Sequence, residues 1–235
     1  MNYDLSVLTR YSTPTVANAI ELFEIRPRNE GYLPPGLQCL NPDAPPVAGF
    51  AATCAISSLS PDSAGRFESF DYWQHLESIH GPRISVVRDL DPSPSPGSFW
   101  GEVNASIHQA LGCVGTVTDG GIRDTAEMKA IGFQALYRYR CVSHAYIHVA
   151  SFGQPVNITG VVIRPGDLLQ MDSHGVLIVP RETLGDLEAA IAEIERRERP
   201  VITYAQSGTA TRAGLVEAVT KNLRNHGPWK PARTS

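Results

Sequence analysis

The chain has 235 residues, which is enough for one sizeable hydrophobic core and for a domain with extensions. Hydrophobic residues make up 42% and charged residues 19%, values that are ordinary for a globular protein and exclude a disordered one. The formal net charge of −4 shows no basic excess, so we expect no nucleic-acid partner.

The chain also lacks sequence signals for a membrane or for secretion. No apolar run approaches the roughly 18 residues that a bilayer-spanning helix needs, so we expect no membrane association. Residues 1–10 do not have the charged-then-apolar pattern of a secretory signal. Cys39, Cys54, Cys113 and Cys141 show no CxxC spacing, and neither a zinc knuckle nor a disulfide framework is indicated. We therefore expect a cytoplasmic protein with reduced cysteines.

Helices and strands alternate along the first part of the chain. Ser12-Thr13-Pro14 predicts a helix start, because a hydroxyl cap precedes a proline at the first helical position. This alternation indicates the α/β class. The expected elements are a helix at 13–23, a strand at 47–56, a helix at 67–79, a strand at 83–88, a helix at 102–111, a strand at 113–118 and a helix at 123–131.

The second part of the chain changes character. Residues 134–179 hold short apolar runs broken by Gly and Pro, which predict a β-rich half with a curved sheet or partial barrel. An amphipathic helix is expected at 182–197, ended by Pro200, and another at 215–223.

We expect two parts in the domain organisation. Residues 1–205 are predicted to form a single α/β domain, and residues 206–235 a C-terminal helix with a basic tail.

The most informative segment is GCVGTVTDGGIRD at 112–124. A buried strand is expected to end at Thr118, and the following Asp119-Gly120-Gly121 allows a tight turn that approaches a ligand closely. Arg123 and Asp124 then stand at the start of the next helix.

Spacing brings a second acid to the same place. Twenty residues separate Glu102 from Arg123. A helix of about nine residues (~14 Å) and a returning strand of about six (~20 Å) would set Glu102 and the Arg123-Asp124 pair at one edge of the sheet. The first amides of that helix, at Val103 and Asn104, would form an anion site beside them. Such a set suits a small carboxylate substrate held beside a divalent metal ion.

A purely structural explanation of the same residues stays open. Asp124-Thr-Ala-Glu127 matches a helix capping box, which by itself would explain both acids. Arg123 could equally be a surface arginine.

The run GxVGTVTDGGIRD resembles the signature of the RraA-like superfamily, named for the regulator of ribonuclease E activity. This superfamily includes 4-hydroxy-4-methyl-2-oxoglutarate (HMG) aldolases, which share an acid-x20-Arg-Asp pattern. The matching motifs extend from about residue 10 to residue 200. Besides GxVGTVTDGGIRD, the matching motifs are Thr13-Pro-Thr-Val-Ala-Asn-Ala-Ile, Trp100-Gly-Glu, Arg164-Pro-Gly-Asp-Leu-Leu, Asp172-Ser-His-Gly-Val and Val179-Pro-Arg-Glu182.

The resemblance implies a fold and an assembly. The fold would be an RraA-like swivelling β/β/α sandwich with a mixed sheet and a partial barrel. The chain would form homotrimers or homohexamers with sites between subunits. A C-terminal acid of a neighbouring subunit would complete each site, with Glu193, Glu195 and Glu198 as the candidates.

The resemblance also implies roles for the matched residues. Asp124 would be the direct metal ligand, Arg123 would clamp the substrate carboxylate and the developing enolate, and the acid at 102 would hold a metal-bound water.

The substrate-binding group would be the backbone around the helix start. The amides of Val103 and Asn104, with Gly101 beside them, would bind the pyruvyl carboxylate.

Two departures from the family pattern bear on the substrate. Position 102 is Glu where the characterised aldolases carry Asp. Asp172-Ser-His-Gly replaces a more acidic loop, and residues 34–46 and 57–69 look lengthened.

A metal route is favoured over a lysine imine for holding the charge of a pyruvate enolate. The chain has only three lysines, Lys129, Lys221 and Lys230. None of them lies in a predicted strand, and a strand is where burial would lower the pKa of a lysine. Mg²⁺ or Mn²⁺ suits the oxygen-rich candidate set.

Other polar residues have open roles. Asp119 is either a turn residue or a support for the site from behind. His144 and His148 have the i, i+4 spacing of zinc ligands on a helix, but their surroundings favour a strand or loop, and structural or supporting roles with them. His144 is the better candidate for lining the pocket, and His174 could also reach one.

The sequence thus predicts a metal-dependent carbon–carbon lyase. We expect a class II pyruvate aldolase acting on a 4-hydroxy-2-oxo acid of the HMG or 4-carboxy-4-hydroxy-2-oxoadipate type, with oxaloacetate decarboxylase activity, in the breakdown of aromatic compounds. The alternative is a non-catalytic binding module that, like the name-giving members, inhibits an RNA-degrading enzyme; those members lack the Arg-Asp pair.

Overall fold

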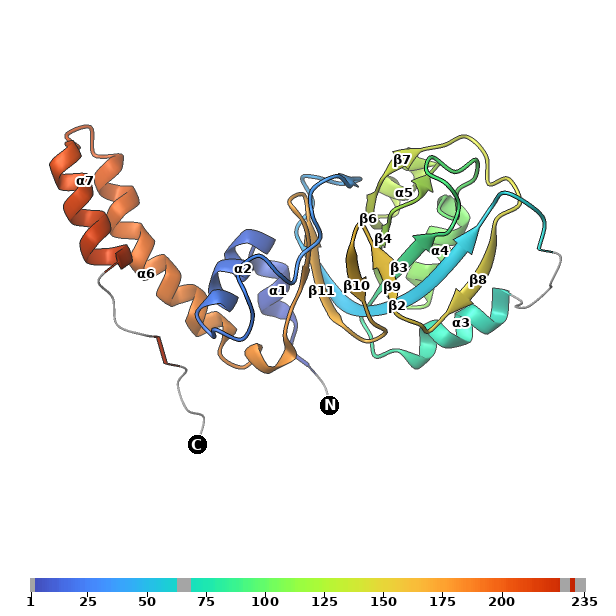
Figure 1. Ribbon diagram of the computed structural model, residues 1–235, viewed down its shortest axis with the longest axis horizontal. Coiled ribbons are helices and arrows are strands. Elements are labelled where there is room, and N and C mark those ends of the chain that lie inside the picture. The colour runs from blue at the N-terminus through green and yellow to red at the C-terminus, as the bar shows by residue number, and fades with distance from the viewer. Residues whose placement is uncertain (1–2, 63–68, 225–228, 231–235) are drawn as a thin grey trace. The chain divides into compact units, whose positions relative to one another are not determined.

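The computed structural model describes residues 3–62, 69–224 and 229–230 (Figure 1). The strands are β1 (Gln38–Cys39), β2 (Val47–Ser57), β3 (Arg83–Asp89), β4 (Cys113–Thr118), β5 (Gly121–Ile122), β6 (Gln134–Tyr137), β7 (Tyr139–Arg140), β8 (His148–Phe152), β9 (Val156–Ile158), β10 (Val161–Ile163), β11 (Leu168–Asp172) and β12 (Gly175–Ile178). The α-helices are α1 (Ser6–Arg10), α2 (Thr13–Glu21), α3 (Ser69–Ser78), α4 (Glu102–Ala110), α5 (Thr125–Ala130), α6 (Leu187–Ala205) and α7 (Arg212–Val219).

The chain divides into two compact units, one of Met1–Thr13 with Gly31–Val179 and one of Pro14–Glu30 with Pro180–Ser235. The second unit collects helical segments from both ends of the sequence. The predicted domain division after residue 205 stays a prediction, and its basic tail lies partly outside the described residues. The predicted lengthened segment 57–69 likewise includes residues outside them.

The first unit is built on one mixed sheet with the strand order β1-β6-β4-β3-β2-β11-β12, and β8 pairs with β2 beside this path. The strands β2, β3, β4 and β6 run parallel, whereas β11 is antiparallel to β2. Figure 1 shows β2 as a long, curved strand. The predicted mixed α/β class with a curved, barrel-like sheet is therefore confirmed.

The central strands are buried on both faces. In β2, Ala51 packs in a cluster with Ile84, while the next residue, Ala52, packs in a different cluster with Val87 and Trp100. Strands covered on both sides have no polar face, which is why β2 appears in the sequence as the nearly continuous apolar run VAGFAATCAIS, with Thr53 as its one interior polar residue.

Arg83, at the start of β3, joins the C-terminal ends of two helices. Its guanidinium donates to the carbonyl oxygens of Ile79 (2.6 Å) and Glu77 (3.1 Å), at the end of α3, and of Leu111 (2.6 Å), after α4. These carbonyls belong to helix ends that lack intrahelical donors, where a cation is also favoured by the helix dipole.

The second unit corrects three predicted helix boundaries. Helix α6 begins at Leu187 and not at residue 182, where Arg181–Thr183 forms a 3-10 turn. Pro200 does not end the helix, because α6 continues through it to Ala205. Proline removes one backbone donor, and at an exposed position the freed carbonyl can be satisfied by water. Helix α7 begins earlier than expected, at Arg212, where the Thr211 hydroxyl accepts the Gly214 amide at 3.2 Å, and a π-helical turn at Thr220–Arg224 follows it. Within the described residues, no helix combines the length and the apolar character that a membrane crossing requires.

We expect Arg83→Met to lower the free energy of unfolding by about 2–3 kcal/mol, because three carbonyl oxygens lose a charged donor. Urea denaturation measures the loss, and Arg164→Met, which alters an exposed arginine, serves as the control. Equal stabilities of the two variants would show that the Arg83 contacts contribute nothing.

His108, on the buried side of α4, is expected to make stability depend on pH. Burial lowers the pKa of His108 from its usual 6.5 to about 4, and its Nδ1 donates to the Asn104 carbonyl at 2.7 Å. Between pH 6.5 and 4 the unfolded state binds the proton and the folded state does not, so stability falls as the pH falls through this window. The full effect is on the order of 3 kcal/mol. The measurement compares wild type with His108→Leu from pH 7 to pH 4, and a difference that stays constant over that range contradicts the prediction.

Candidate functional site

The predicted site residues lie on three neighbouring backbone segments of the first unit. Trp100 forms a parallel β-bridge with Ile122, and β5 pairs in parallel with β7, with Ile122 opposite Arg140. The Arg123 amide donates to the Trp100 carbonyl, and the Cys141 amide to the Ile122 carbonyl, each at 3.0 Å. Residues 121–124 therefore form the middle of three adjacent segments, with 100–102 on one side and 139–141 on the other.

Asp124 has a left-handed backbone, with φ 50° and ψ 43°, and it directly precedes α5. Its side chain makes no hydrogen bond to the start of α5, so the capping-box interpretation is wrong. The left-handed backbone is the physical reason, because an N-cap residue normally has an extended backbone. Instead, Oδ2 of Asp124 accepts the amide of Glu102 at 3.2 Å, at the positive end of α4. The structure thus brings the Glu102 backbone and Asp124 to one place, as the twenty-residue spacing predicted.

Arg123 and Asp124 form a half-exposed pair. Their side chains are 35% and 32% exposed, and Arg123 Nε lies 3.7 Å from Asp124 Oδ2. This separation is longer than a hydrogen bond, so both charged groups can still bind a small ligand. Solvent reaches both, so the attraction between them contributes little to stability.

Gly101 is the residue against which this pair packs. A Cβ atom at position 101 would lie 2.5 Å from Asp124 Oδ2 and 3.2 Å from Arg123 Nε. The backbone at Gly101 is extended (φ −164°), so close packing, and not conformational freedom, explains the glycine.

The predicted anion-binding amides stand at the start of α4. The Ala105 amide donates to the Gly101 carbonyl and begins the helical ladder. The amides of Val103 and Asn104 fall in the first turn, where the helix itself offers no acceptor. The Asn104 side chain donates to the Phe99 carbonyl at 2.6 Å, which fixes the approach to the helix.

Asp119 is buried behind the turn that leads to Arg123. It accepts the Asp89 amide at 2.9 Å and pairs with the Arg88 guanidinium, so it ties the end of β3 to the end of β4. Burial raises the pKa of Asp119, although the Asp89 amide and Arg88 oppose this shift. In this structure Asp119 braces the turn.

Sequence reasoning missed two residues that support the same turn. The buried Ser98 hydroxyl lies 2.7 Å from the Trp100 carbonyl and 2.8 Å from the Gly121 carbonyl. The buried Asp89 carboxylate accepts the Ser95 hydroxyl at 2.6 Å and lies against Gly120. The available signal was the polar run that follows β3, since side chains after neighbouring parallel strands meet at one sheet edge.

The predicted histidine candidates do not join this group through any described hydrogen bond. His144 is exposed on a loop, with Nδ1 2.8 Å from the Ala145 carbonyl, and His148 lies in β8, with Nδ1 2.9 Å from the Tyr146 carbonyl. The expectation that His144 lines the site stays a prediction.

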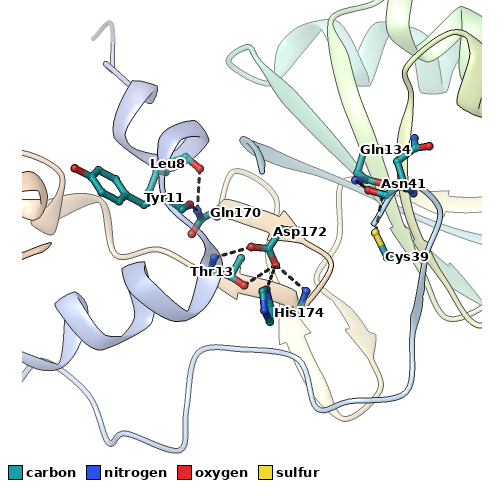
Figure 2. Close-up of polar contacts among 9 residues, drawn as sticks. All are labelled: Leu8, Tyr11, Thr13, Cys39, Asn41, Gln134, Gln170, Asp172 and His174. Atoms are coloured by element: carbon teal, nitrogen blue, oxygen red, sulfur yellow. Dashed lines mark hydrogen bonds and ion pairs between the residues drawn. The ribbon is translucent and has the colours of Figure 1, made fainter. Parts of the chain in front are cut away.

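Asp172 binds the N-terminal segment instead, and His174 hydrogen-bonds to Asp172 (Figure 2). The Asp172 carboxylate accepts the Thr13 amide at 2.8 Å, the Thr13 hydroxyl at 2.7 Å and the His174 amide at 2.8 Å. Burial alone would raise the pKa of Asp172, but these hydrogen bonds outweigh it and lower the pKa. Gln170 donates to the Leu8 and Tyr11 carbonyls nearby, so this edge of the sheet anchors residues 8–13.

The three candidate acids on α6, Glu193, Glu195 and Glu198, have different surroundings, and Glu195 is exposed. Glu193 accepts hydrogen bonds from Arg196 and Arg197, which lower its pKa to about 2. Glu198 lines a cavity of about 340 Å³ within the second unit. Glu193 is therefore already neutralised within its own helix, whereas Glu198 faces open space.

The donors at this site fit a hydrated divalent cation. Among the described residues no group of three or more His, Cys, Asp or Glu side chains could hold a metal ion. Asp124 offers one carboxylate that is about one-third exposed to solvent. Mg²⁺ and Mn²⁺ commonly bind proteins through one or two carboxylates and keep several waters.

We expect Gly101→Ala to destabilise the first unit by about 1–3 kcal/mol, because the new methyl group overlaps the Asp124 carboxylate. The same substitution in an Asp124→Gly background should cost much less, since the overlapping group is gone. Urea denaturation of the four proteins forms a double-mutant cycle. An identical cost in both backgrounds would contradict the close packing of these residues.

Comparisons with known proteins identify the family of this chain. The RraA-like family, described as Aldolase/RraA, matches residues 13–178. A protein of Halalkalibacterium halodurans, provisionally named a 4-hydroxy-4-methyl-2-oxoglutarate aldolase, is 31% identical over 106 residues, which is 43% of this chain and 50% of the relative. Protein DlpA of Legionella pneumophila is 27% identical over 150 residues, 63% of this chain and 24% of the relative. The matches therefore span half or less of these relatives.

A solved structure gives the fold. RraAS2 of Streptomyces coelicolor, described as an unusual member of the RNase ES inhibitor RraA protein family, superposes with a TM-score of 0.64 at 24% identity, covering 85% of this chain and 97% of that one. The predicted RraA-like fold is thereby confirmed. With its family match across 13–178 and this fold, the chain belongs to the RraA-like family.

Proposed function

We propose that this protein is a divalent-cation-dependent lyase that cleaves a 4-hydroxy-2-oxo acid to pyruvate and a second carbonyl compound. The observation that carries the proposal is the backbone of Asp124. Residues held in the left-handed region at a cost in energy concentrate at functional sites. Here that conformation directs a carboxylate away from its own helix and toward Arg123, Gly101 and the amide end of α4.

The residues around Asp124 suit the two ends of such a substrate. Arg123 would bind the 1-carboxylate, with the first-turn amides of Val103 and Asn104 as further donors. Gly101, without a side chain, lets Asp124 and Arg123 lie directly against the start of α4. Asp124 would hold Mg²⁺ or Mn²⁺, which when bound supplies the positive charge that stabilises an enolate.

Glu102 is the residue that would direct proton transfer. When the C3–C4 bond breaks, the 4-hydroxyl loses its proton and C3 of the departing pyruvate must gain one. A water oriented by the Glu102 carboxylate would take the first proton and return one to C3. Loss of carbon dioxide from oxaloacetate leaves the same enolate, so we propose oxaloacetate decarboxylation as a second activity.

A lysine imine would be the alternative electron sink, and the described lysines do not suit it. Lys129 is exposed on α5, Lys221 is exposed in the π-helical turn after α7, and Lys230 is exposed near the C-terminus. None of the three has the buried, apolar surroundings that activate an imine-forming lysine.

The assembly and the physiological role extend the proposal. We propose a homotrimer or homohexamer in which an α6 acid of a neighbouring copy completes the site. Because Glu193 is neutralised by Arg196 and Arg197, Glu195 and Glu198 are the better candidates. A role in the breakdown of aromatic compounds, with substrates of the HMG type, belongs to the same proposal.

The alternative function is a non-catalytic regulator that binds an RNA-degrading enzyme. A solved structure of similar fold is described as a member of an RNase inhibitor family, which keeps this alternative open. Metal binding separates the two functions, because the regulator has no need of it.

Asp124→Asn tests the proposal. Asparagine tolerates a left-handed backbone and keeps an acceptor for the Glu102 amide, so stability should stay within about 1 kcal/mol of wild type. The charge is lost, and both Mn²⁺ binding by calorimetry and pyruvate release from 4-hydroxy-2-oxo acids should fall by about 100-fold or more.

Glu127→Gln is the matched control, because Glu127 lies exposed in the first turn of α5 and should not affect either measurement. Pyruvate release by Asp124→Asn at the wild-type rate, or release that needs no divalent cation, would refute the lyase. A wild-type chain that binds no Mn²⁺ would favour the regulator.

A further inference from the structure

Ser98 is the side chain through which the three backbone segments of the candidate site meet. It is 2% exposed and lies two residues before the Trp100 bridge. Its hydroxyl oxygen is 2.7 Å from the Trp100 carbonyl and 2.8 Å from the Gly121 carbonyl, and it accepts the Trp100 amide at 3.1 Å. Its own amide donates to the carbonyl of Ser143, two residues after the third segment, at 3.0 Å.

Counting protons shows what the hydroxyl contributes. A serine hydroxyl has one proton to donate and two lone pairs to accept with. The Trp100 carbonyl already accepts the Arg123 amide at 3.0 Å, so it does not depend on the serine proton. The Gly121 carbonyl belongs to the neighbouring segment, so the contact of the Ser98 hydroxyl with it joins segment 98–102 to segment 121–124.

The distance between these two segments sets the geometry of the proposed site. Glu102 and the helix amides follow Trp100 within four residues, while Arg123 and Asp124 follow Gly121 within three. The 3.2 Å contact from the Glu102 amide to Asp124 Oδ2 spans the same gap. A small relaxation of the Ser98 contacts would therefore separate the carboxylate from the helix start.

We propose that Ser98 is a positioning residue that sets the separation of Glu102 and Asp124 and thereby the affinity of the site for a divalent cation. The cation part of this inference rests on the proposed function. The backbone part does not, and a measurement that needs no metal ion can test it. Supporting groups outside the direct ligands commonly change metal affinity by about 10- to 100-fold.

The test compares the full-length wild type with Ser98→Ala and with Ser85→Ala as the matched control. Ser85 is equally buried, and its hydroxyl lies 2.9 Å from the Tyr72 hydroxyl, within β3 and away from the three segments. Both variants lose one buried serine hydroxyl, so their thermal midpoints should fall similarly. Differences between them then report on position and not on general stability.

Two measurements decide the question. Amide hydrogen exchange at Glu102 and Arg123, followed by NMR without metal, should accelerate about tenfold or more in Ser98→Ala relative to Ser85→Ala. The dissociation constant for Mn²⁺, from calorimetry, should rise about tenfold in Ser98→Ala and stay within about twofold of wild type in Ser85→Ala. Ser98→Cys, with a weaker donor of similar size, should give intermediate values and decides the matter if Ser98→Ala does not fold.

Protected Glu102 and Arg123 amides in Ser98→Ala, with an Mn²⁺ affinity equal to that of the wild type, would overturn the inference. Failure of the proposed function has a different signature, because the wild type itself would then bind no Mn²⁺. In that case the inference about cation affinity falls with it, and amide exchange alone decides whether Ser98 positions the two segments.

Discussion

The hydrogen bond from the Glu102 amide to the Asp124 carboxylate is the interaction on which the arrangement of the candidate site depends. It joins two points of the chain that are 22 residues apart. Asp124 makes this contact with a left-handed backbone, a conformation that aspartate adopts more readily than most residues other than glycine. The neighbouring β-bridge between Trp100 and Ile122 and the close packing of Gly101 hold that conformation in place.

The buried acids behind this contact have a different purpose. Asp119 takes the Asp89 amide and the Arg88 guanidinium, and Asp89 takes the Ser95 hydroxyl. A buried carboxylate with its hydrogen bonds satisfied is costly to uncover, so these groups fix the strand ends more readily than they bind a ligand. Arg123 and Asp124, each about one-third exposed, keep their charges accessible. The sheet edge therefore combines a buried support with a charged rim that solvent can reach.

The sequence predicted those parts of the fold and site that depend on pattern and spacing. The strand at 113–118 agrees with β4, and the twenty-residue spacing placed Glu102 near Asp124 because helix rise and strand rise are nearly constant. The prediction from sequence failed where a residue's role depends on its backbone conformation or on a partner that is distant in the chain. The Asp124-to-Glu127 motif matches a capping box whatever φ is adopted, and nothing near Ser98 in sequence reveals that its hydroxyl meets Gly121. The prediction that Pro200 ends the helix failed for a related reason. The energetic cost of a proline inside a helix depends on whether solvent can reach the carbonyl that loses its donor, and the local sequence does not show this.

A comparison of helix starts shows why the failure at Asp124 points to function. Helix α7 follows the local rule, with an extended Thr211 whose hydroxyl accepts the Gly214 amide. Helix α4 begins at a glycine that has no side chain to cap it, and it takes the carboxylate of Asp124 from the next α/β unit, while α5 is left without that cap. Local rules are broken where function competes with stability. The Glu102 amide and Arg123 Nε both lie near Oδ2, so these two groups fix the orientation of the Asp124 carboxylate, which would hold the cation in the proposed function.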